Sequence, residues 1–466
     1  MNPLLSNLEE IKKAYLHEPN PTLAIRRKRI ERLLQMVKEN EENLCKALSA
    51  DFGQRNTIET QFAELAMIAQ AGKYTLKNLR SWMKPIAVKT PIHLKPSQSY
   101  LMPQSKGVVG IMSPWNYPLQ LALVPVIAAF AAGNRVWLKP SERSPRISGY
   151  LASLITQYFH PSEFSVTCGD AEVSKQFAEL PFDHLLFTGS TAAGKHVMRA
   201  AAENLTPVTL ELGGKSPCII DASASLIDAT SRIAYGKLLN AGQTCIAPDY
   251  LLVPAKLVEQ VVTNLQKNVQ KMFTNVQDLT FPIDQRQLER WQWLVNDAVG
   301  KGATAIPLFA KEQIAGYPFM PTLILNPSSE SALMKEEIFG PILPIVVYSE
   351  INEVIDYINQ HDHPLALYWF GKAKANLQKV LDLTHAGGVT VNDTLLHIAN
   401  DHLPFGGVGH SGMGAYHGKF GFDSFTHFKP VLNVKNYLGL RSLSGTKTAH
   451  PPYGKMIRHI INFLSR

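Results

Sequence analysis

The sequence contains few cysteines and no apolar run long enough to cross a bilayer. Its four cysteines, at positions 45, 168, 218 and 245, lie far apart and form no CxxC pair. This argues against a zinc site or a secreted disulfide framework and favours a reducing cytoplasm. The longest apolar run, residues 119–133, contains Pro125 and predicts a buried helix rather than a membrane span. Charged residues near the N-terminus leave no apolar core for a secretory signal peptide.

Internal repeats, low-complexity tracts and nucleic-acid recognition motifs are also lacking. The net charge is +8, but basic and acidic residues are interspersed. Residues 25–44, IRRKRIERLLQMVKENEENL, are typical of an exposed helix with ion pairs. We therefore expect no nucleic-acid partner. An anionic cofactor or a lipid surface accounts equally well for the basic excess.

What the sequence does contain is a long alternation of short apolar runs and helical stretches. With 466 residues, 45% of them hydrophobic and 18% charged, the chain is too long for one core and predicts two or more globular domains. Residues 8–83 have helical spacing, and the proline-rich segment 84–106 predicts an extended connector or edge strand. Beyond residue 107 the alternation predicts βαβ units and parallel sheets. The expected strands are GVVGIMSP, NRVWLKP, FSVTCG, HLLFTGS and VTLELGG, followed by SPCIID, YLLVP, ILPIVVY, ALYWFG and GGVTVND.

Three polar residues in these loops are candidates for catalysis. Cys245 in NAGQTCIAPDY is either an inert thiol or a nucleophile beside exposed main-chain N–H groups. Glu211 in TLELGGKSP either caps a turn or pairs with Lys215, or it acts as a general base. Asn116 in SPWNYP either forms a turn or donates to a developing oxyanion.

Three further motifs suit a nucleotide. The motif LLFTGSTAAGKHV, residues 185–197, predicts a strand, a glycine turn and a helix. Either the N-terminus of this helix binds an anion, or the turn only connects the two elements. In WLKPSE, Lys139 and Glu142 suit the hydroxyls of a ribose or form a surface ion pair. In EEIFGPILP, Glu337 and Phe339 either contact a ribose or only turn the chain.

Taken together, these motifs resemble the aldehyde dehydrogenase superfamily from about residue 8 to about residue 435. The resemblance rests on FTGSTAAGK, PVTLELGGKSP, GQTCIAPDY, EEIFGP and LPFGGVGHSGMGAYHG. PVTLELGGKSP and YHGKFGFDSFTH are similar to the class 3 branch. GGVTVNDTLLHIAN and SWMKP are similar to bacterial coniferyl aldehyde dehydrogenases.

The resemblance implies an α/β fold with two parallel-sheet domains. A Rossmann-like cofactor domain would take residues 1–83 and 107–210, and a catalytic domain residues 211–395. Residues 84–106 and 396–435 would form a β bridging or oligomerisation arm, followed by a basic amphipathic tail over 436–466. Strand edges in the arm would be covered by a second subunit, so a homodimer is expected.

The resemblance also implies oxidation of an aldehyde to a carboxylic acid with a nicotinamide cofactor and no metal. Cys245, with a lowered pKa, would attack the aldehyde as a thiolate. Asn116 would hold the oxyanion, and Glu211 would activate the water that hydrolyses the thioester. NAD is expected to be preferred, with NADP also accepted. The implied cofactor contacts are Lys139, Glu142, Gly189, Ser190, Thr191, Gly194, Leu212, Glu337 and Phe339.

The substrate pocket implied by the class 3 resemblance consists of Tyr117, Tyr235, Leu239 and Phe405. Many class 3 relatives have IAWGK where this chain has IAYGK, and the hydroxyl of Tyr235 suits a polar ring substituent. An aromatic aldehyde such as coniferaldehyde, or a medium-to-long apolar aldehyde, is therefore expected. A second departure from class 3, LTFPIDQRQLERWQWL within residues 273–320, predicts a different local shape with the chemistry retained.

Two alternatives to this function stay open. One is an inactive relative that binds cofactor without turnover, and the other is a relative that transfers the acyl group to coenzyme A. The presence of Glu211 favours hydrolysis.

The tail sequence GKMIRHIINFLSR predicts a basic amphipathic helix, which either packs on the protein or makes a peripheral contact with an anionic membrane surface. The expected location is cytoplasmic in both cases.

Overall fold

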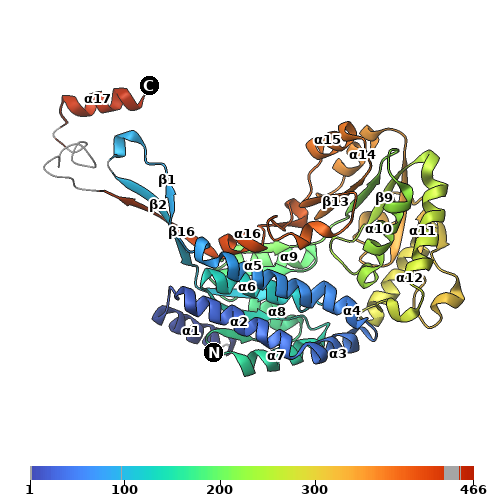
Figure 1. Cartoon of the computed structure of the whole chain (residues 1–466), viewed down its shortest axis with the longest axis horizontal. Helices are drawn as coiled ribbons and strands as arrows, with labels where there is room; N and C mark the ends of the chain where they lie inside the picture. The colour runs from blue at the N-terminus through green and yellow to red at the C-terminus, as the bar shows by residue number, and fades with distance from the viewer. Residues whose placement is uncertain (1–2, 96, 435–450, 452, 466) are drawn as a thin grey trace.

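A computed structural model describes residues 3–95, 97–434, 451 and 453–465. Two mainly parallel sheets are covered by helices, and a small antiparallel sheet projects from the body (Figure 1). The predicted α/β architecture is confirmed, and the predicted strands are all present. None of the described helices combines the length and apolar content needed to cross a bilayer.

The first sheet has six strands and places the loops that carry several candidate residues. From the central strand β3 the chain runs outward through β4 and β5 on one side and through β6 and β7 on the other. Ligands bind such sheets at the carboxyl ends of the strands, at the point where the chain connections run to opposite sides of the sheet. In spatial order the strands are β15 (Gly412–Met413), β7 (Val208–Glu211), β6 (His184–Thr188), β3 (Val108–Met112), β4 (Arg135–Lys139) and β5 (Phe164–Val166).

The second sheet has seven strands, parallel except for the edge strand β10. In spatial order they are β10 (Thr304–Pro307), β11 (Thr322–Leu325), β12 (Ile342–Tyr348), β9 (Tyr250–Pro254), β8 (Pro217–Ile220), β13 (Ala366–Phe370) and β14 (Gly388–Val391). The sequence did not predict β10 and β11. β10 is a short edge strand with no buried residue, so it lacks the apolar pattern of an inner strand.

The projecting arm is an antiparallel sheet of β1 (Ile86–Val88), β2 (Gln98–Ser105) and β16 (Thr426–Asn433). The extended structure predicted for residues 84–106 is therefore confirmed. The short strand β15 lies within the segment assigned to the arm but pairs with β7 of the first sheet. The domain boundaries themselves stay a prediction.

Helix α6 (Gln120–Ala132) is the buried helix predicted from the long apolar run. All of its residues are buried, because α2, α5 and the first sheet pack around it. The helices before it are α1 (Pro3–His17), α2 (Leu23–Glu39), α3 (Glu41–Phe52), α4 (Thr57–Thr60) and α5 (Ala66–Trp82), with the π-helical turn η1 (Gln61–Leu65) between α4 and α5.

The remaining helices cover the two sheets and the C-terminal region. They are α7 (Pro145–Tyr158), α8 (Ala171–Ala178), α9 (Thr191–Ala202), α10 (Leu226–Leu238), α11 (Val258–Met272), α12 (Gln285–Gly300), α13 (Ala332–Lys335), α14 (Ile351–Asn359), α15 (Lys374–Leu383), α16 (Gly418–Ser424) and α17 (Lys455–Leu464). The predicted tail helix is present as α17, whereas residues 436–450, 452 and 466 of the tail lie outside the described residues.

Candidate active site

The candidate catalytic residues meet where the first sheet faces the loop that carries Cys245. Asn116 follows β3, and Glu211 is the last residue of β7. Because parallel strands end at the same edge of a sheet, both residues lie at that edge. The side chain of Asn116 contacts Gln243 in the loop of Cys245, and the carboxylate of Glu211 lies close enough to Cys245 to affect its thiol.

Cys245 lies in a tight loop that follows α10. The loop begins with η3 (Leu239–Gly242), in which Asn240 and Ala241 adopt left-handed φ angles of 52° and 53°. Such angles are uncommon outside glycine and cluster at functional sites. The Cys245 side chain is half-buried. It packs against the core on one side and lines a cavity on the other, so the thiol can be reached from the cavity.

The protein groups around Cys245 favour the protonated thiol. Burial raises the pKa of Cys245, and the carboxylates of Glu337 and Glu211 raise it further. The main-chain N–H groups of Cys245 and Ile246 act in the opposite direction. Among the protein groups, burial and two carboxylates outweigh two N–H groups. The lowering of the thiol pKa is expected from N–H dipoles together with the positive charge of the cofactor, and it stays a prediction for the cofactor-bound enzyme.

Glu211 is a buried carboxyl group without a hydrogen-bond partner. It is 2% exposed, and neither of its carboxylate oxygens has a partner among the described residues. Burial raises the pKa of Glu211 well above its ordinary value. Unpartnered buried carboxyl groups are rare in stable cores and are frequent at catalytic sites.

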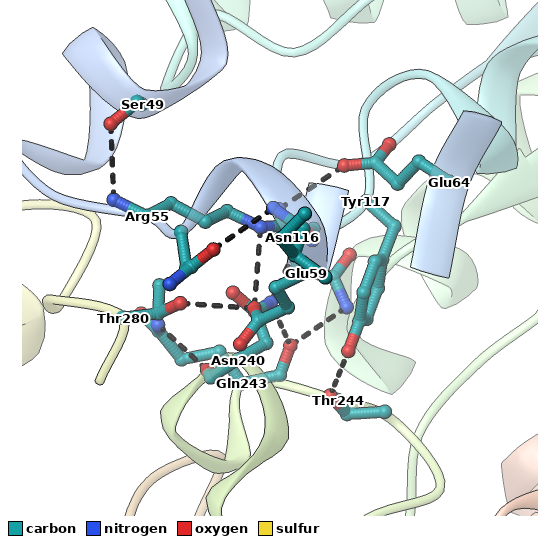
Figure 2. Close-up of polar contacts among 12 residues, drawn as sticks. Ser49, Arg55, Glu59, Glu64, Asn116, Tyr117, Asn240, Gln243, Thr244 and Thr280 are labelled. Carbon is teal, nitrogen blue, oxygen red and sulfur yellow. Dashed lines mark hydrogen bonds and ion pairs between the residues drawn. The ribbon is translucent and has the colours of Figure 1, made fainter. Parts of the chain in front are cut away.

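Asn116 is held from several directions (Figure 2). Its side-chain Nδ2 donates to the carbonyl oxygen of Gln243 at 3.0 Å. Its own main-chain oxygen accepts hydrogen bonds from Arg55 Nη1 and from Asn240 Nδ2, each at 3.0 Å. The amide is therefore fixed relative to the loop of Cys245.

The cavity beside Cys245 has a volume of about 420 Å³ and mostly apolar walls. Three of the predicted pocket residues, Tyr117, Tyr235 and Leu239, line it. Phe405 is absent from its lining: this ring is buried and lies against His397, with ring centres 5.9 Å apart. Further apolar lining comes from residues that the sequence had not indicated, namely Phe62, Met67, Leu121, Met272, Leu395 and Leu396.

The predicted phosphate-binding turn joins β6 to α9. Ser190 caps α9 by accepting a hydrogen bond from the N–H of Ala193 at 3.3 Å. A Cβ on Gly194 would lie 2.6 Å from the side chain of Leu212, so a larger residue there would force Leu212 to move. The Thr191 hydroxyl donates to the carbonyl of His410 at 3.1 Å.

The predicted ribose contacts lie at two other strand and loop ends. Lys139, the last residue of β4, is buried, and its Nζ lies 3.7 Å from the carboxylate of Glu142. A Cβ on Gly213 would lie 2.1 Å from Glu337 Oε2, so the Glu337 carboxylate packs directly on the main chain there. Burial raises the pKa of Glu337 to about 8.

Phe339 lies beside the indole of Trp115. The two ring centres are 5.4 Å apart in an edge-to-face arrangement. Phe339 has a φ of 49°, and its carbonyl accepts hydrogen bonds from Gln287 and Trp291. These two bonds hold an uncommon backbone conformation in place.

These residues fit a nicotinamide dinucleotide. The N-terminus of α9 supplies N–H groups for phosphates, and the two carboxylates suit ribose hydroxyls. Next to the turn, the hydroxyl of Thr188 is buried without a hydrogen-bond partner in the described chain. Such an atom is available to a ligand.

Sequence reasoning missed the buried cluster of Arg55, Glu59 and Glu64 next to Asn116 (Figure 2). In the sequence, Arg55 and Glu59 have the spacing of an exposed helical ion pair. Only packing shows that Arg55 is buried and that Glu59 is largely covered. No motif in the sequence indicates this cluster.

Comparison with known proteins agrees with the motifs. The profile of the aldehyde dehydrogenase family matches residues 9–431. The chain is 46% identical over 451 residues to a probable coniferyl aldehyde dehydrogenase of Pseudomonas aeruginosa, covering 96% of this chain and 93% of the relative. It is 38% identical to the dimeric NADP-preferring aldehyde dehydrogenase of Rattus norvegicus, covering 98% of this chain and 100% of the relative.

A solved structure shows the same fold. The structure described as the substrate-bound state of Staphylococcus aureus AldH has a TM-score of 0.92 and 37% sequence identity, with 100% of both chains covered. This confirms the expected aldehyde dehydrogenase-like fold. The chain belongs to the aldehyde dehydrogenase family and is an oxidoreductase that acts on an aldehyde with NAD or NADP.

Proposed function

We propose that Cys245, Asn116 and Glu211 oxidise an aromatic or apolar aldehyde to its carboxylic acid in the cavity of about 420 Å³. One observation carries this assignment of roles. The thiol of Cys245 lines an apolar cavity. The unpartnered carboxyl group of Glu211 acts on this thiol, and the Asn116 amide is bonded to the loop that carries it.

The first step is attack of the Cys245 sulfur on the aldehyde carbon. The thiol first loses its proton to a neighbouring carboxylate or to water, because burial keeps it protonated at rest. A C–S bond forms, and the carbonyl oxygen becomes an oxyanion. The Asn116 amide and the Cys245 N–H donate to that oxygen, and one such donor contributes about 3 kcal/mol to catalysis.

The second half of the reaction releases the acid. When bound, the nicotinamide cofactor supplies the hydride acceptor that brings the carbon on Cys245 to the oxidation level of a thioester. Glu211 then takes a proton from water, and the hydroxide attacks the thioester carbon. The C–S bond breaks and releases the carboxylic acid, and the departing sulfur takes up the proton that Glu211 removed from water, which restores the thiol and the Glu211 carboxylate.

The cofactor would be held by the predicted residues. The turn from Gly189 through Ser190 and Thr191 to Gly194 would contact the phosphates, since α9 begins there. Lys139 and Glu142 would hold the adenosine ribose, and Glu337 the nicotinamide ribose. Leu212 and Phe339 would pack against the cofactor rings. We infer a preference for NAD, because a carboxylate at Glu142 favours free hydroxyls over a phosphate.

The substrate is proposed to be aromatic. The cavity is apolar, and Tyr235, which is 41% exposed, places a hydroxyl-bearing ring at its wall. The relative from Pseudomonas aeruginosa and a second relative from Pseudomonas sp., 42% identical, are named for coniferyl aldehyde. Coniferaldehyde is therefore the first substrate to test, and a medium-to-long apolar aldehyde is the second.

Assembly and location complete the proposal. We propose a homodimer, because β1 is an exposed edge strand of the projecting arm. Sedimentation analysis would show a mass of one chain if this is wrong.

Helix α17 is proposed to pack on the protein or to touch an anionic membrane. Sedimentation with anionic liposomes at low salt distinguishes these two positions. A cytoplasmic location is proposed from the four free cysteines.

The test is formation of NADH by the purified chain with coniferaldehyde, benzaldehyde and straight-chain aldehydes. Turnover that is absent in Cys245→Ala, yields free acid and needs no coenzyme A supports the proposal. Dependence on coenzyme A would instead indicate the acyl-transferring alternative. Binding of NAD without turnover of any aldehyde would indicate the inactive alternative.

A further inference from the structure

Arg55 is a buried cation that lies between the buried Glu64 and the half-buried Glu59, beside the Asn116 loop (Figure 2). Its side chain is 0% exposed. Its Nη1 lies 3.1 Å from Glu64 Oε1, and its Nε lies 3.4 Å from Glu59 Oε1. Burial raises the pKa of both glutamates, and buried ion pairs are in general a weak source of stability.

The same guanidinium touches both residues that face the loop of Cys245. Its Nη1 donates to the main-chain oxygen of Asn116 at 3.0 Å, and its central carbon lies 5.0 Å from the ring centre of Tyr117. The Tyr117 hydroxyl in turn shares a hydrogen bond of 2.7 Å with Thr244. One side chain therefore supports two neighbouring residues that each contact the nucleophile loop.

The two glutamates anchor Arg55 to different parts of the fold. Glu64 Oε2 accepts hydrogen bonds from the N–H groups of Leu119 and Gln120 at 2.7 and 3.1 Å, where α6 begins. Glu64 itself lies in the π-helical turn η1, a type of irregularity that is frequent near functional sites.

Glu59 reaches the other side of the cluster. Its Oε1 accepts a hydrogen bond from the Thr280 hydroxyl at 2.9 Å, and its carboxylate also accepts from the main-chain N–H of Asn240. Asn240 is one of the two left-handed residues just before Cys245. The cluster thus links the N-terminal helices, the Asn116 loop and the nucleophile loop.

We propose that Arg55 is a positioning residue that holds the Asn116 amide where the oxyanion forms. The inference rests on the proposed function, since it assigns that amide the oxyanion. The guanidinium Nη1 reaches both the Asn116 carbonyl and Glu64, while Nε lies within ion-pair distance of Glu59. A lysine ammonium is a single point of charge and does not span these positions. Displacement of a catalytic group by about 1 Å lowers the rate up to about 100-fold.

The test is a double-mutant cycle on kcat with coniferaldehyde and NAD. Arg55→Met is expected to lower kcat about 10- to 100-fold, with the KM for aldehyde changed less than about threefold. In the Asn116→Ala background, the same Arg55→Met change is expected to lower kcat less than about threefold, because the amide it positions is gone. Equal factors in the two backgrounds would overturn the proposal.

A matched control is Arg29→Met. Arg29 is also buried between two glutamates, Glu18 at 2.9 Å and Glu163 at 3.1 Å, but none of its partners among the described residues belongs to the Asn116 loop. It is expected to lose stability without a change in kcat. Where Arg55→Met does not fold, Arg55→Lys keeps the charge without the fork and is expected to show a smaller loss of kcat in the same cycle.

Hydrogen exchange gives a readout that does not need turnover. Amide exchange in residues 113–121 is expected to rise in the Arg55 variant and to stay unchanged in Arg29→Met. Wild-type protein without aldehyde oxidation would remove the proposed function, and the exchange result would still decide whether Arg55 holds the loop. Unchanged exchange together with unchanged kcat in Arg55→Lys or Arg55→Met would overturn the proposal.

Discussion

The side-chain amide of Asn116 donates a hydrogen bond of 3.0 Å to the carbonyl oxygen of Gln243. This bond joins the loop after β3 to the loop that carries Cys245. The proposed oxyanion donor and the proposed nucleophile are therefore positioned as one unit, although they come from distant parts of the sequence. Changes to either loop are expected to affect kcat more than cofactor affinity.

Glu211→Gln is expected to separate the two halves of the reaction. The first turnover should still produce a burst of NADH, because attack and hydride loss do not need this base. Steady turnover should fall about 10²- to 10⁴-fold. Since burial raises the pKa of Glu211, wild-type turnover limited by hydrolysis should rise with pH, and this rise should be lost in the variant. Stopped-flow measurement of NADH over a pH series checks the burst and the pH dependence of turnover. The exposed Glu203→Gln is the control variant.

Glu211→Leu is expected to stabilise the protein while abolishing hydrolysis. A raised pKa means that the folded chain binds this proton more tightly than the unfolded chain does. The free energy of unfolding therefore falls as pH rises above the ordinary carboxyl value of 4.5. Removing the unpartnered group should add about 1–3 kcal/mol at neutral pH. Thermal unfolding of both proteins should show a difference that shrinks toward pH 4.5, and a less stable variant at neutral pH would contradict this account.

Gly213→Ala is expected to weaken cofactor binding through Glu337. The new Cβ would lie 2.1 Å from Glu337 Oε2, so the carboxylate must move. We expect the Kd for NAD to rise about tenfold, equivalent to about 1.4 kcal/mol, as measured by fluorescence titration. Gly300→Ala is the matched control, because a Cβ there meets nothing within 4 Å. Equal Kd values in the two variants would argue against Glu337 as a ribose contact.

Tyr235→Ala is expected to change the choice of substrate. Removal of this wall of the cavity should raise the KM for coniferaldehyde about tenfold, within the range typical for a lost apolar contact. A straight-chain aldehyde should be affected less. Tyr235→Phe tests the hydroxyl alone and should alter the KM for coniferaldehyde but not that for benzaldehyde. Steady-state kinetics on coniferaldehyde, benzaldehyde and a straight-chain aldehyde measures these changes in KM.

The sequence predicted most of the sheets because their inner strands are continuous apolar runs. Strands β3, β4 and β8 are buried at every position, and such runs between glycine and proline residues are easily recognised. Strand β15 has only two residues, too few for any pattern. It is defined by pairing with β7 and not by its own sequence.

The site was predicted unevenly for a similar reason. Cys245, Glu211 and Asn116 stand in distinctive motifs, and the structure brings them to one place. Arg55 stands in a polar stretch that resembles an exposed helix start, and its role depends on packing against distant residues. The pKa of Cys245 could not be predicted either, because it reflects the sum of burial and two carboxylates from separate elements.

The pairing of β15 with β7 has a consequence for synthesis of the chain. Glu211 lies opposite Gly412 in this pairing. The strand β15 therefore leaves the ribosome long after β7, the strand that it covers. The same holds for β2, whose partner β16 follows later still. A nascent chain can therefore build most of its core during translation, but the surroundings of Glu211 are completed only after residue 413 has been made. Catalytic competence is thereby tied to the synthesis of β15.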